Sequence, residues 1–306
     1  MRRLLALALL FAACVSHAAE LKLLEVLSQE PTPRLITYTP SQLDPRNPAN
    51  QVRLATSSIR ADLEVLRKVF DGLVLYGYHE ANTPRILAVA RDLKFKVVLI
   101  GVWDIKNAGE LDGAAALAKF HLDDFALGVL VGNEGITFNR YEKEDLAIAA
   151  ARMRKQLPPS VAIGTSEPLV GYKHDEVRTF GDFLAPNIHP VFDRKDFPPA
   201  EAAAWAREEA LKLAKETKKP VLLKETGFPH AGKPMYTPES QRAFWAAYTK
   251  PGLLVKADGA WVYHGVAFEA FDLPWKSEES KLEIEKSWGL FSPKREAYPA
   301  LDVWKR

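Results

Sequence analysis

Two glutamates directly follow continuous apolar runs, and their placement could support acid–base chemistry on a substrate. Glu134 ends the segment 129–134 (VLVGNE), and Glu225 ends the segment 221–225 (VLLKE). A charge at the rim of a buried core costs free energy unless it has a partner or a function. One such carboxylate alone is more often a salt-bridge member or a helix cap. Two that face each other could cleave a glycosidic bond, one as acid and the other as nucleophile or as the base that activates water.

Eight short apolar or β-branched runs predict the strands that would position these carboxylates. They cover residues 35–38, 73–76, 96–100, 127–131, 161–163, 183–185, 221–223 and 260–263. Most are continuously apolar, which is typical of strands covered on both faces. Amphipathic segments, typical of helices, occupy 57–70, 142–157 and 199–218, and Thr-Pro pairs at 83–84 and 237–238 mark two further helix starts.

This alternation predicts an α/β fold, a single (β/α)8 TIM barrel. A doubly wound open sheet is the alternative, but the segment 38–41 (YTPS) is not the glycine-rich first turn that such a sheet usually carries. Strands four and seven lie on opposite sides of an eight-stranded barrel, so Glu134 and Glu225 would face each other across its mouth.

Other polar and aromatic residues follow the predicted strands. Aromatic faces such as those of Tyr76, Trp103 and Trp275 suit the apolar faces of sugar rings. Each of these rings could equally be part of the core, and His189 alone is better explained as a hydrogen-bonded wall residue than as a base. For Lys224, which interrupts an apolar run, the simplest expectation is a side chain that points away from the barrel axis.

The two carboxylate segments resemble the signatures of glycoside hydrolase family 17, the β-1,3-glucanases. Residues 187–190 (NIHP) resemble the family's Asn-Ile-Tyr-Pro stretch, with histidine at 189 in place of tyrosine. Residues 268–276 and 285–291 resemble its closing segments, nearest to the bacterial branch, although plant members carry an acid where this chain has Leu273. The resemblance covers about residues 33 to 300.

The resemblance implies a retaining mechanism, in which the two carboxyls lie roughly 5–5.5 Å apart. Glu134 would be the general acid/base and Glu225 the nucleophile. Asn133 would bond the sugar 2-hydroxyl, and Tyr76 would donate a hydrogen bond near the nucleophile. Lys276 and Glu285 match a Lys/Glu pair that shapes the family's site. The remaining candidates for substrate-binding residues along the subsites are Glu167, Asn187, His189 and Trp275.

Three functions remain open on these residues. The first is a retaining glycosidase that cleaves β-1,3-glucan of the laminarin type. The second is a β-glucan transglycosylase that uses the same two glutamates, because water and a sugar hydroxyl compete for the intermediate. The third is a non-catalytic glucan-binding barrel, which predicts that one of the two carboxylates is absent or buried in a salt bridge.

Composition excludes several other classes of protein. Of 306 residues, 47% are hydrophobic and 26% charged, which argues against disorder and against a multi-span membrane protein. Forty-one basic and thirty-nine acidic residues are present without a long basic stretch, so we expect no nucleic-acid partner. No residues with metal-ligand spacing occur, so we expect no metal and no cofactor. The expected partner is a β-glucan oligo- or polysaccharide, bound by a monomer.

Residues 1–18 have the pattern of a secretory signal peptide. Arg2 and Arg3 precede the apolar segment 4–13, and the small residues of 16–18 (SHA) would allow cleavage before Ala19. The catalytic domain would then span 19–306 in the periplasm or outside the cell, with no transmembrane segment and no cysteine in the mature chain. A lipoprotein anchored through Cys14 is the alternative, which the sequence before Cys14 fits poorly.

Overall fold

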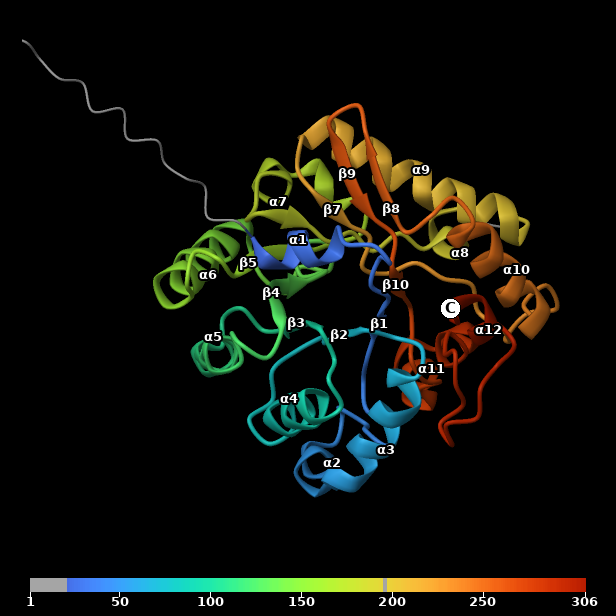
Figure 1. Cartoon of the computed structure of the whole chain (residues 1–306), viewed down its shortest axis with the longest axis horizontal. Helices are drawn as coiled ribbons and strands as arrows, with labels where there is room; N and C mark the ends of the chain where they lie inside the picture. Colours follow the sequence, from blue (N-terminus) through green and yellow to red (C-terminus); the bar gives the residue numbers. More distant parts are fainter. Residues whose placement is uncertain (1–20, 195–196) are drawn as a thin grey trace, which may run out of the picture.

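The computed structural model describes residues 21–194 and 197–306. The predicted signal peptide, residues 1–18 with Cys14, lies outside the described residues. Within the described part, strands and helices alternate along the chain and form one curled sheet surrounded by helices (Figure 1).

The parallel strands follow one another around the sheet in chain order. β9 pairs with β7 and β10 pairs with β1, and only two residues separate β9 from β10, so together they occupy the eighth position and close the barrel. An extra strand, β8 (Leu254–Ala257), lies antiparallel to β9. The predicted TIM barrel is therefore confirmed. The parallel strands are β1 (Leu35–Thr37), β2 (Gly72–Val74), β3 (Val97–Val102), β4 (Ala126–Asn133), β5 (Ala162–Ser166), β6 (Phe183–Leu184), β7 (Val221–Leu222), β9 (Ala260–Tyr263) and β10 (Val266–Ala267).

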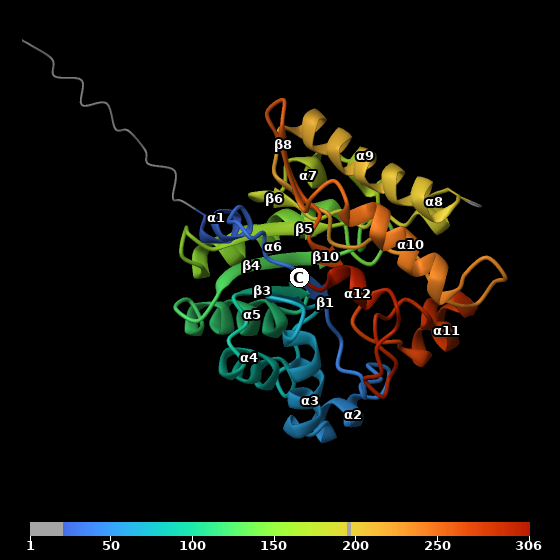
Figure 2. The ribbon, with the colours of Figure 1, turned by 45° about the vertical axis from the view of Figure 1, so that its right-hand side comes forward.

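The predicted helices form at the expected places. α10 (Pro238–Thr249) begins with a capping box in which the Thr237 side chain accepts from Ser240 N–H at 3.1 Å. It packs against α9 (Pro199–Thr217) on the outside of the barrel (Figure 2). The other predicted helices are α3 (Thr56–Arg67), α4 (Thr83–Asp92) and α6 (Lys143–Gln156). However, α3, α4 and α9 have no side-chain cap, and Thr83, predicted as a cap, is the first residue of α4.

Several helices were not expected from the sequence. α5 (Ala108–Phe120) is rich in alanine and glycine, so its apolar residues show no helical stripe. The others are short and end in loops: α1 (Lys22–Leu27), α2 (Pro48–Arg53), α7 (Asp175–Arg178), α8 (Pro190–Asp193), α11 (Pro274–Ser280), α12 (Leu301–Trp304) and the 3-10 turns η1 (Gly171–Lys173) and η2 (Glu283–Lys286).

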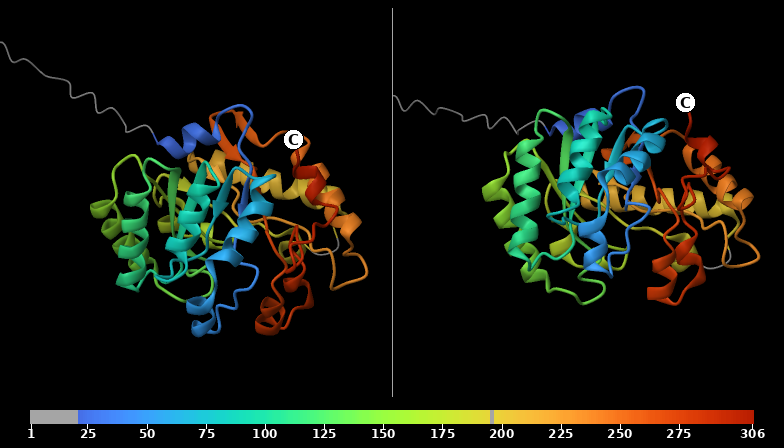
Figure 3. Two further views of the ribbon diagram at one scale, coloured as in Figure 1. Left: turned by 60° about the horizontal axis from the view of Figure 1, so that its bottom comes forward. Right: turned by 90° about the horizontal axis from the view of Figure 1, so that it is seen from below.

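The two ends of the barrel differ. At the amino-terminal ends of the strands, α1 buries Leu23 and Leu27 against strand residues such as Leu35 and Val97, and so covers the barrel interior. α2 and α11 project from the opposite end, away from α1 (Figure 3). The carboxyl ends of the strands are therefore the open end, where a barrel enzyme carries its site.

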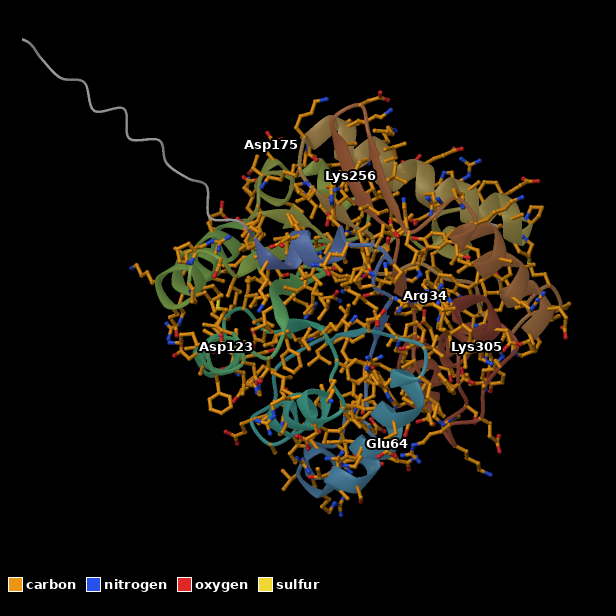
Figure 4. The ribbon with its side chains drawn as sticks, viewed as in Figure 1. Arg34, Glu64, Asp123, Asp175, Lys256 and Lys305 are labelled. Atoms are coloured by element: carbon orange, nitrogen blue, oxygen red, sulfur yellow. The ribbon has the colours of Figure 1, made fainter. Side chains whose placement is uncertain are left out.

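The outer surface is charged, as expected for a solvated ring of helices. Charged side chains labelled in Figure 4, among them Glu64, Asp175 and Lys256, are exposed. Within the part of the chain that the structure describes, no helix combines the length and apolar character needed to cross a membrane.

Candidate active site

The end of β4 turns sharply, which brings two consecutive side chains to the same cleft. The pairing of β4 with β5 shifts register between Leu130 and Asn133, as at a β-bulge. Gly132 and Glu134 both have left-handed backbones, with φ of 84° and 57°. In a regular strand, neighbouring side chains point to opposite faces. Here Asn133 and Glu134 both line the cleft.

The loop after β7 presents the second carboxylate. Glu225 is nearly buried, with 6% of its surface exposed, yet it lines the same cleft as Glu134. Its carbonyl accepts a hydrogen bond from Ile188 N–H at 2.8 Å, which ties the loop to the segment after β6. The two acids predicted from the sequence therefore meet at the open end of the barrel.

A polar network connects the two acids. The side-chain N–H of Asn187 donates to Glu134 Oε1 at 2.7 Å and lies 3.4 Å from Asn133 Oδ1. Lys224 Nζ donates to the same Asn133 oxygen and forms an ion pair with Glu225 Oε1 at 2.8 Å. The expectation that Lys224 points away from the axis was wrong, because its ammonium group lies between these two site residues.

His189 contacts the other oxygen of Glu225. Its Nε2 lies 3.2 Å from Glu225 Oε2. The imidazole ring packs among aromatic rings, with centroid distances of 5.0 Å to Phe268, 5.2 Å to Trp288 and 5.9 Å to Phe192. These rings fix the imidazole at the wall of the cleft.

The environments of the two acids push their pKa values in opposite directions. Burial opposes ionisation of Glu225, but the charge of Lys224 and the hydrogen bond and charge of His189 outweigh it and lower its pKa to about 2. Burial, followed by the negative charge of Glu225, raises the pKa of Glu134. Glu225 is therefore a carboxylate at neutral pH, whereas Glu134 keeps its proton to higher pH than an ordinary glutamate. Divergent values of this kind are typical of an acid and nucleophile pair.

The cleft is large enough for several sugar rings. Its volume is about 1100 Å³. Trp103 is 44% exposed at its rim, and the Arg140 guanidinium lies 4.1 Å above the Trp103 ring. Other exposed apolar side chains that line the cleft are Phe138, Val170, Phe192 and Leu282. Such a rim offers stacking surfaces to a sugar chain.

Four further predicted residues lie at the open end of the barrel, but the ion pair that Lys276 forms differs from the one expected. Tyr76, Trp275, Lys276 and Glu285 all line the cleft. Lys276, however, pairs with Glu269, its Nζ lying 2.9 and 2.7 Å from the two carboxylate oxygens, rather than with Glu285. Glu285 instead contributes negative charge near this pair.

Two of these groups have shifted pKa values that follow from burial. Burial, the charge of Glu225 and that of Glu269 raise the pKa of Tyr76, which keeps its hydroxyl protonated as a donor. Burial raises the pKa of Glu269 to about 7, although Lys276 counteracts part of the effect.

Glu167 does not occupy the predicted position. It is fully buried, does not line the cleft, and accepts hydrogen bonds from Ile136 N–H at 2.9 Å, Thr137 N–H at 3.1 Å and the Thr137 hydroxyl at 2.7 Å. The expectation of a substrate contact is therefore corrected. All three donors belong to the loop after β4, so the carboxylate holds the segment that follows Glu134.

Sequence reasoning missed a matching carboxylate on the other side of β4. Glu110, in α5, accepts from Tyr78 N–H at 3.1 Å, from Asp104 N–H at 2.9 Å and from Trp103 N–H. It thereby fixes the loops after β2 and β3, including the rim residue Trp103. No signal marked it in the sequence, because a helix surface commonly carries glutamate.

Metal ligation finds no support in the side-chain arrangement. Across residues 21–194 and 197–306, no three histidine, cysteine, aspartate or glutamate side chains converge in a way that would hold an ion. The basic groups beside Glu225 are the Lys224 ammonium group and the His189 imidazole.

Comparison with known proteins connects this site to glucan-active enzymes. The model of the BtgE/BtgC glycoside hydrolase domain matches residues 36–289. A glucan 1,3-beta-glucosidase of Saccharomyces cerevisiae is 23% identical over 265 residues, which are 78% of this chain and 82% of that protein. A probable glucan endo-1,3-beta-glucosidase, btgC, of Aspergillus clavatus is 26% identical over 313 residues. That match covers 89% of this chain but only 41% of the Aspergillus protein.

Solved structures show the same fold at lower sequence identity. The family 17 beta-1,3-glucanosyltransferase of Rhizomucor miehei superposes with a TM-score of 0.68 at 18% identity, covering 90% of this chain and 98% of its own. An endo-laminarinase of Formosa superposes with a TM-score of 0.70 at 18% identity, covering 85% and 83%.

Proposed function

The chain belongs to the BtgE/BtgC glycoside hydrolase domain family, and from this premise we propose that it cleaves β-1,3-glucan through a covalent glycosyl-enzyme intermediate. The predicted resemblance to glycoside hydrolase family 17 is confirmed at the level of the family. The expected place in the bacterial branch stays a prediction.

One observation carries the mechanism: two carboxyl groups whose pKa values are shifted in opposite directions line the same cleft. Glu225, ionised at neutral pH, attacks the anomeric carbon. Glu134, which keeps its proton to higher pH than an ordinary glutamate, donates it to the leaving oxygen. The resulting Glu134 carboxylate then takes a proton from water, which attacks the anomeric carbon and releases Glu225. The product keeps the configuration of the substrate.

The neighbouring residues take roles that follow from their contacts. Asn187 holds the carboxyl of Glu134 through its 2.7 Å hydrogen bond. His189 holds the second oxygen of Glu225. Asn133, which Asn187 and Lys224 contact, would bond the sugar 2-hydroxyl, an interaction that strengthens in the oxocarbenium-like transition state.

The substrate assignment draws on the relatives and on the shape of the cleft. The matched yeast and Aspergillus proteins are named for action on 1,3-β-glucan. A cleft of about 1100 Å³ with an apolar rim suits a chain of several sugars. The chain spans about two fifths of btgC, so the proposal for this chain extends only to the 1,3 linkage of the glucan.

Products from purified laminari-oligosaccharides, separated by mass, test this function. We expect shorter oligosaccharides whose newly formed ends are initially β, as seen by proton NMR. Glu225→Gln should lower kcat/KM by several orders of magnitude without changing the circular dichroism spectrum. Wild-type turnover by this variant would refute the assigned nucleophile.

Transglycosylation is the second candidate, and the rim of the cleft favours it. Trp103 and Phe138, 44% and 63% exposed, line the cleft together with Glu134, the residue proposed to protonate the leaving group. An acceptor sugar stacked there would compete with water for the intermediate. Products longer than the supplied oligosaccharide would identify a transferase.

The ion pair of Glu225 bears on the non-catalytic alternative. That alternative expected one carboxylate to be buried in a salt bridge, and Glu225 does pair with Lys224. The pair does not remove the carboxylate from the cleft, however, because Glu225 remains among its lining residues. Membership in a glycoside hydrolase family favours catalysis over binding alone.

We also propose export of the chain, with cleavage before Ala19, and a monomeric mature protein. The amino-terminal pattern of residues 1–18 supports export. Intact mass of the protein recovered from the periplasm or the medium would test the cleavage site. Light scattering would test the monomer.

A further inference from the structure

Lys224 is a buried cation inside the candidate active site. Only 2% of its surface is exposed, and it follows the apolar residues of β7. A buried ammonium group is costly unless other groups compensate its charge. Its compensation comes from the Glu225 carboxylate at 2.8 Å, the Asn133 side-chain oxygen and the face of the Tyr76 ring, whose centroid lies 5.0 Å away. All three partners line the cleft.

The contact with Asn133 fixes which end of its amide faces a ligand. An asparagine side chain carries an accepting oxygen at one end and a donating NH2 group at the other. Lys224 Nζ and Asn187 Nδ2 both approach the oxygen, and both are donors. A flipped amide would place donors against donors, so the oxygen must face Lys224. The NH2 end is then the one available to a ligand in the cleft.

Asn187 is the second donor to the Asn133 oxygen. Its NH2 group lies 2.7 Å from Glu134 Oε1 and 3.4 Å from Asn133 Oδ1, while its own oxygen faces the Ser166 hydroxyl at 3.0 Å. The orientation of Asn133 thus depends on two donors, of which only Lys224 carries a charge.

We propose that Lys224 is a positioning residue with two simultaneous effects: it holds Glu225 as an ionised nucleophile, and it turns the Asn133 NH2 group toward the 2-hydroxyl of the sugar under attack. This inference rests on the proposed function and adds to it a residue outside the acid–nucleophile pair. Lys224 is not among the residues that line the cleft, so it does not contact the sugar itself. It acts through Glu225 and Asn133, and a neutral side chain at 224 would weaken both effects.

Several charged and titratable groups around Lys224 determine what its replacement would do to the site. Glu225 and Tyr76 contact it directly, and the ionisation of Glu134 also responds to its charge. His189 contacts the other oxygen of Glu225 and still supports ionisation when Lys224 is absent. The variant is therefore expected to remain active at a reduced rate, which leaves its kinetics measurable.

The test compares Lys224→Met with wild type on two substrates. One is nitrophenyl β-laminaribioside, and the other lacks the 2-hydroxyl on the sugar joined to nitrophenol. In wild type, kcat/KM should be much higher for the complete substrate. In Lys224→Met we expect the ratio of the two kcat/KM values to fall about 10-fold or more, because only the uncharged Asn187 donor, 3.4 Å away, would still orient Asn133. The acid limb of the pH profile should also move to higher pH.

Lys219→Met is the matched control. Lys219 is half-buried and donates to the Phe180 carbonyl at 3.0 Å, away from the cleft. Its replacement should leave the substrate ratio and the acid limb unchanged. If Lys224→Met does not fold, as judged by circular dichroism, Lys224→Gln replaces it. Glutamine can still donate to Asn133, so it should move the acid limb while largely preserving the ratio.

The outcomes separate the two proposals. If kcat/KM of Lys224→Met falls equally on both substrates and the acid limb of its pH profile does not shift, Lys224 has only a structural role, and the positioning role is overturned. Absence of wild-type turnover on every laminari-oligosaccharide would overturn the proposed function, and the role of Lys224 with it. A lower ratio of kcat/KM between the two substrates, together with an acid limb shifted to higher pH, supports both the proposed function and the positioning role of Lys224.

Discussion

Replacing Glu167 by glutamine tests whether this buried carboxylate organises the loop that carries the acid. The carboxylate receives three hydrogen bonds from Ile136 and Thr137, two of them at one oxygen. Glutamine preserves the shape of the side chain but exchanges one accepting oxygen for an NH2 group. That group cannot accept from a backbone N–H, so one backbone donor loses its partner and the bonds that remain lose the negative charge.

The expected magnitude follows from these contacts. A hydrogen bond to a charged group contributes about 1.5–3 kcal/mol to stability, and a buried donor without a partner costs about 1–3 kcal/mol. The Thr137 hydroxyl can rotate to accept from the new NH2 group, so its bond is kept in reversed form. We therefore expect Glu167→Gln to lower the free energy of unfolding by roughly 2–4 kcal/mol.

Urea unfolding and steady-state kinetics measure the two consequences. The unfolding midpoint should fall, and kcat should fall because Glu134 precedes the loosened loop, while KM for laminari-oligosaccharides should change little. Thr137→Val is the matched control, since it removes one bond of the three and should cost about 1 kcal/mol. A Glu167→Gln protein of unchanged stability but strongly raised KM would refute this reasoning and restore Glu167 as a substrate contact.

Three further predictions concern the acid, the rim and the turn after β4. Burial and the charge of Glu225 raise the pKa of Glu134, and Glu134 acts as an acid only when protonated, so kcat/KM should fall as pH rises through that pKa. Glu134→Gln should lack this fall at alkaline pH. Its pH profile can be measured with a dinitrophenyl glycoside, whose leaving group needs no proton. Trp103→Ala should raise KM for long oligosaccharides about 10-fold, with little change for short ones, because it removes an exposed stacking surface. Gly132→Ala should lower stability in urea by roughly 1–3 kcal/mol or more, because φ is 84° there and an added Cβ would collide with the Tyr141 hydroxyl.

The sequence was sufficient for the barrel and for the two acids because both depend on local patterns. Apolar runs identify buried strands, and a charged residue at the end of such a run indicates a candidate functional residue, as at Glu134 and Glu225. The short β6 and β7, with two residues each, were still located from the longer apolar runs around them.

The roles of individual polar residues were harder to predict because they depend on contacts between distant segments. Glu167 and Asn187 both follow predicted strands, yet one is bonded behind the cleft and the other within it. The partner of Lys276 is Glu269, seven residues earlier, instead of Glu285. Lys224 offered one signal, a cation within an apolar run beside an acid, but its direction depended on the turn that follows β7.

The cover that α1 forms over the barrel has a consequence for attachment. The described chain enters the fold there, and the carboxyl terminus emerges on the same side, away from α2 and α11 (Figure 3). A tag or a surface joined directly before α1 or at the carboxyl terminus would therefore lie on the side of the barrel opposite the cleft. If the protein is immobilised at either of these points, its cleft should face outward, where it remains accessible to a large polymer.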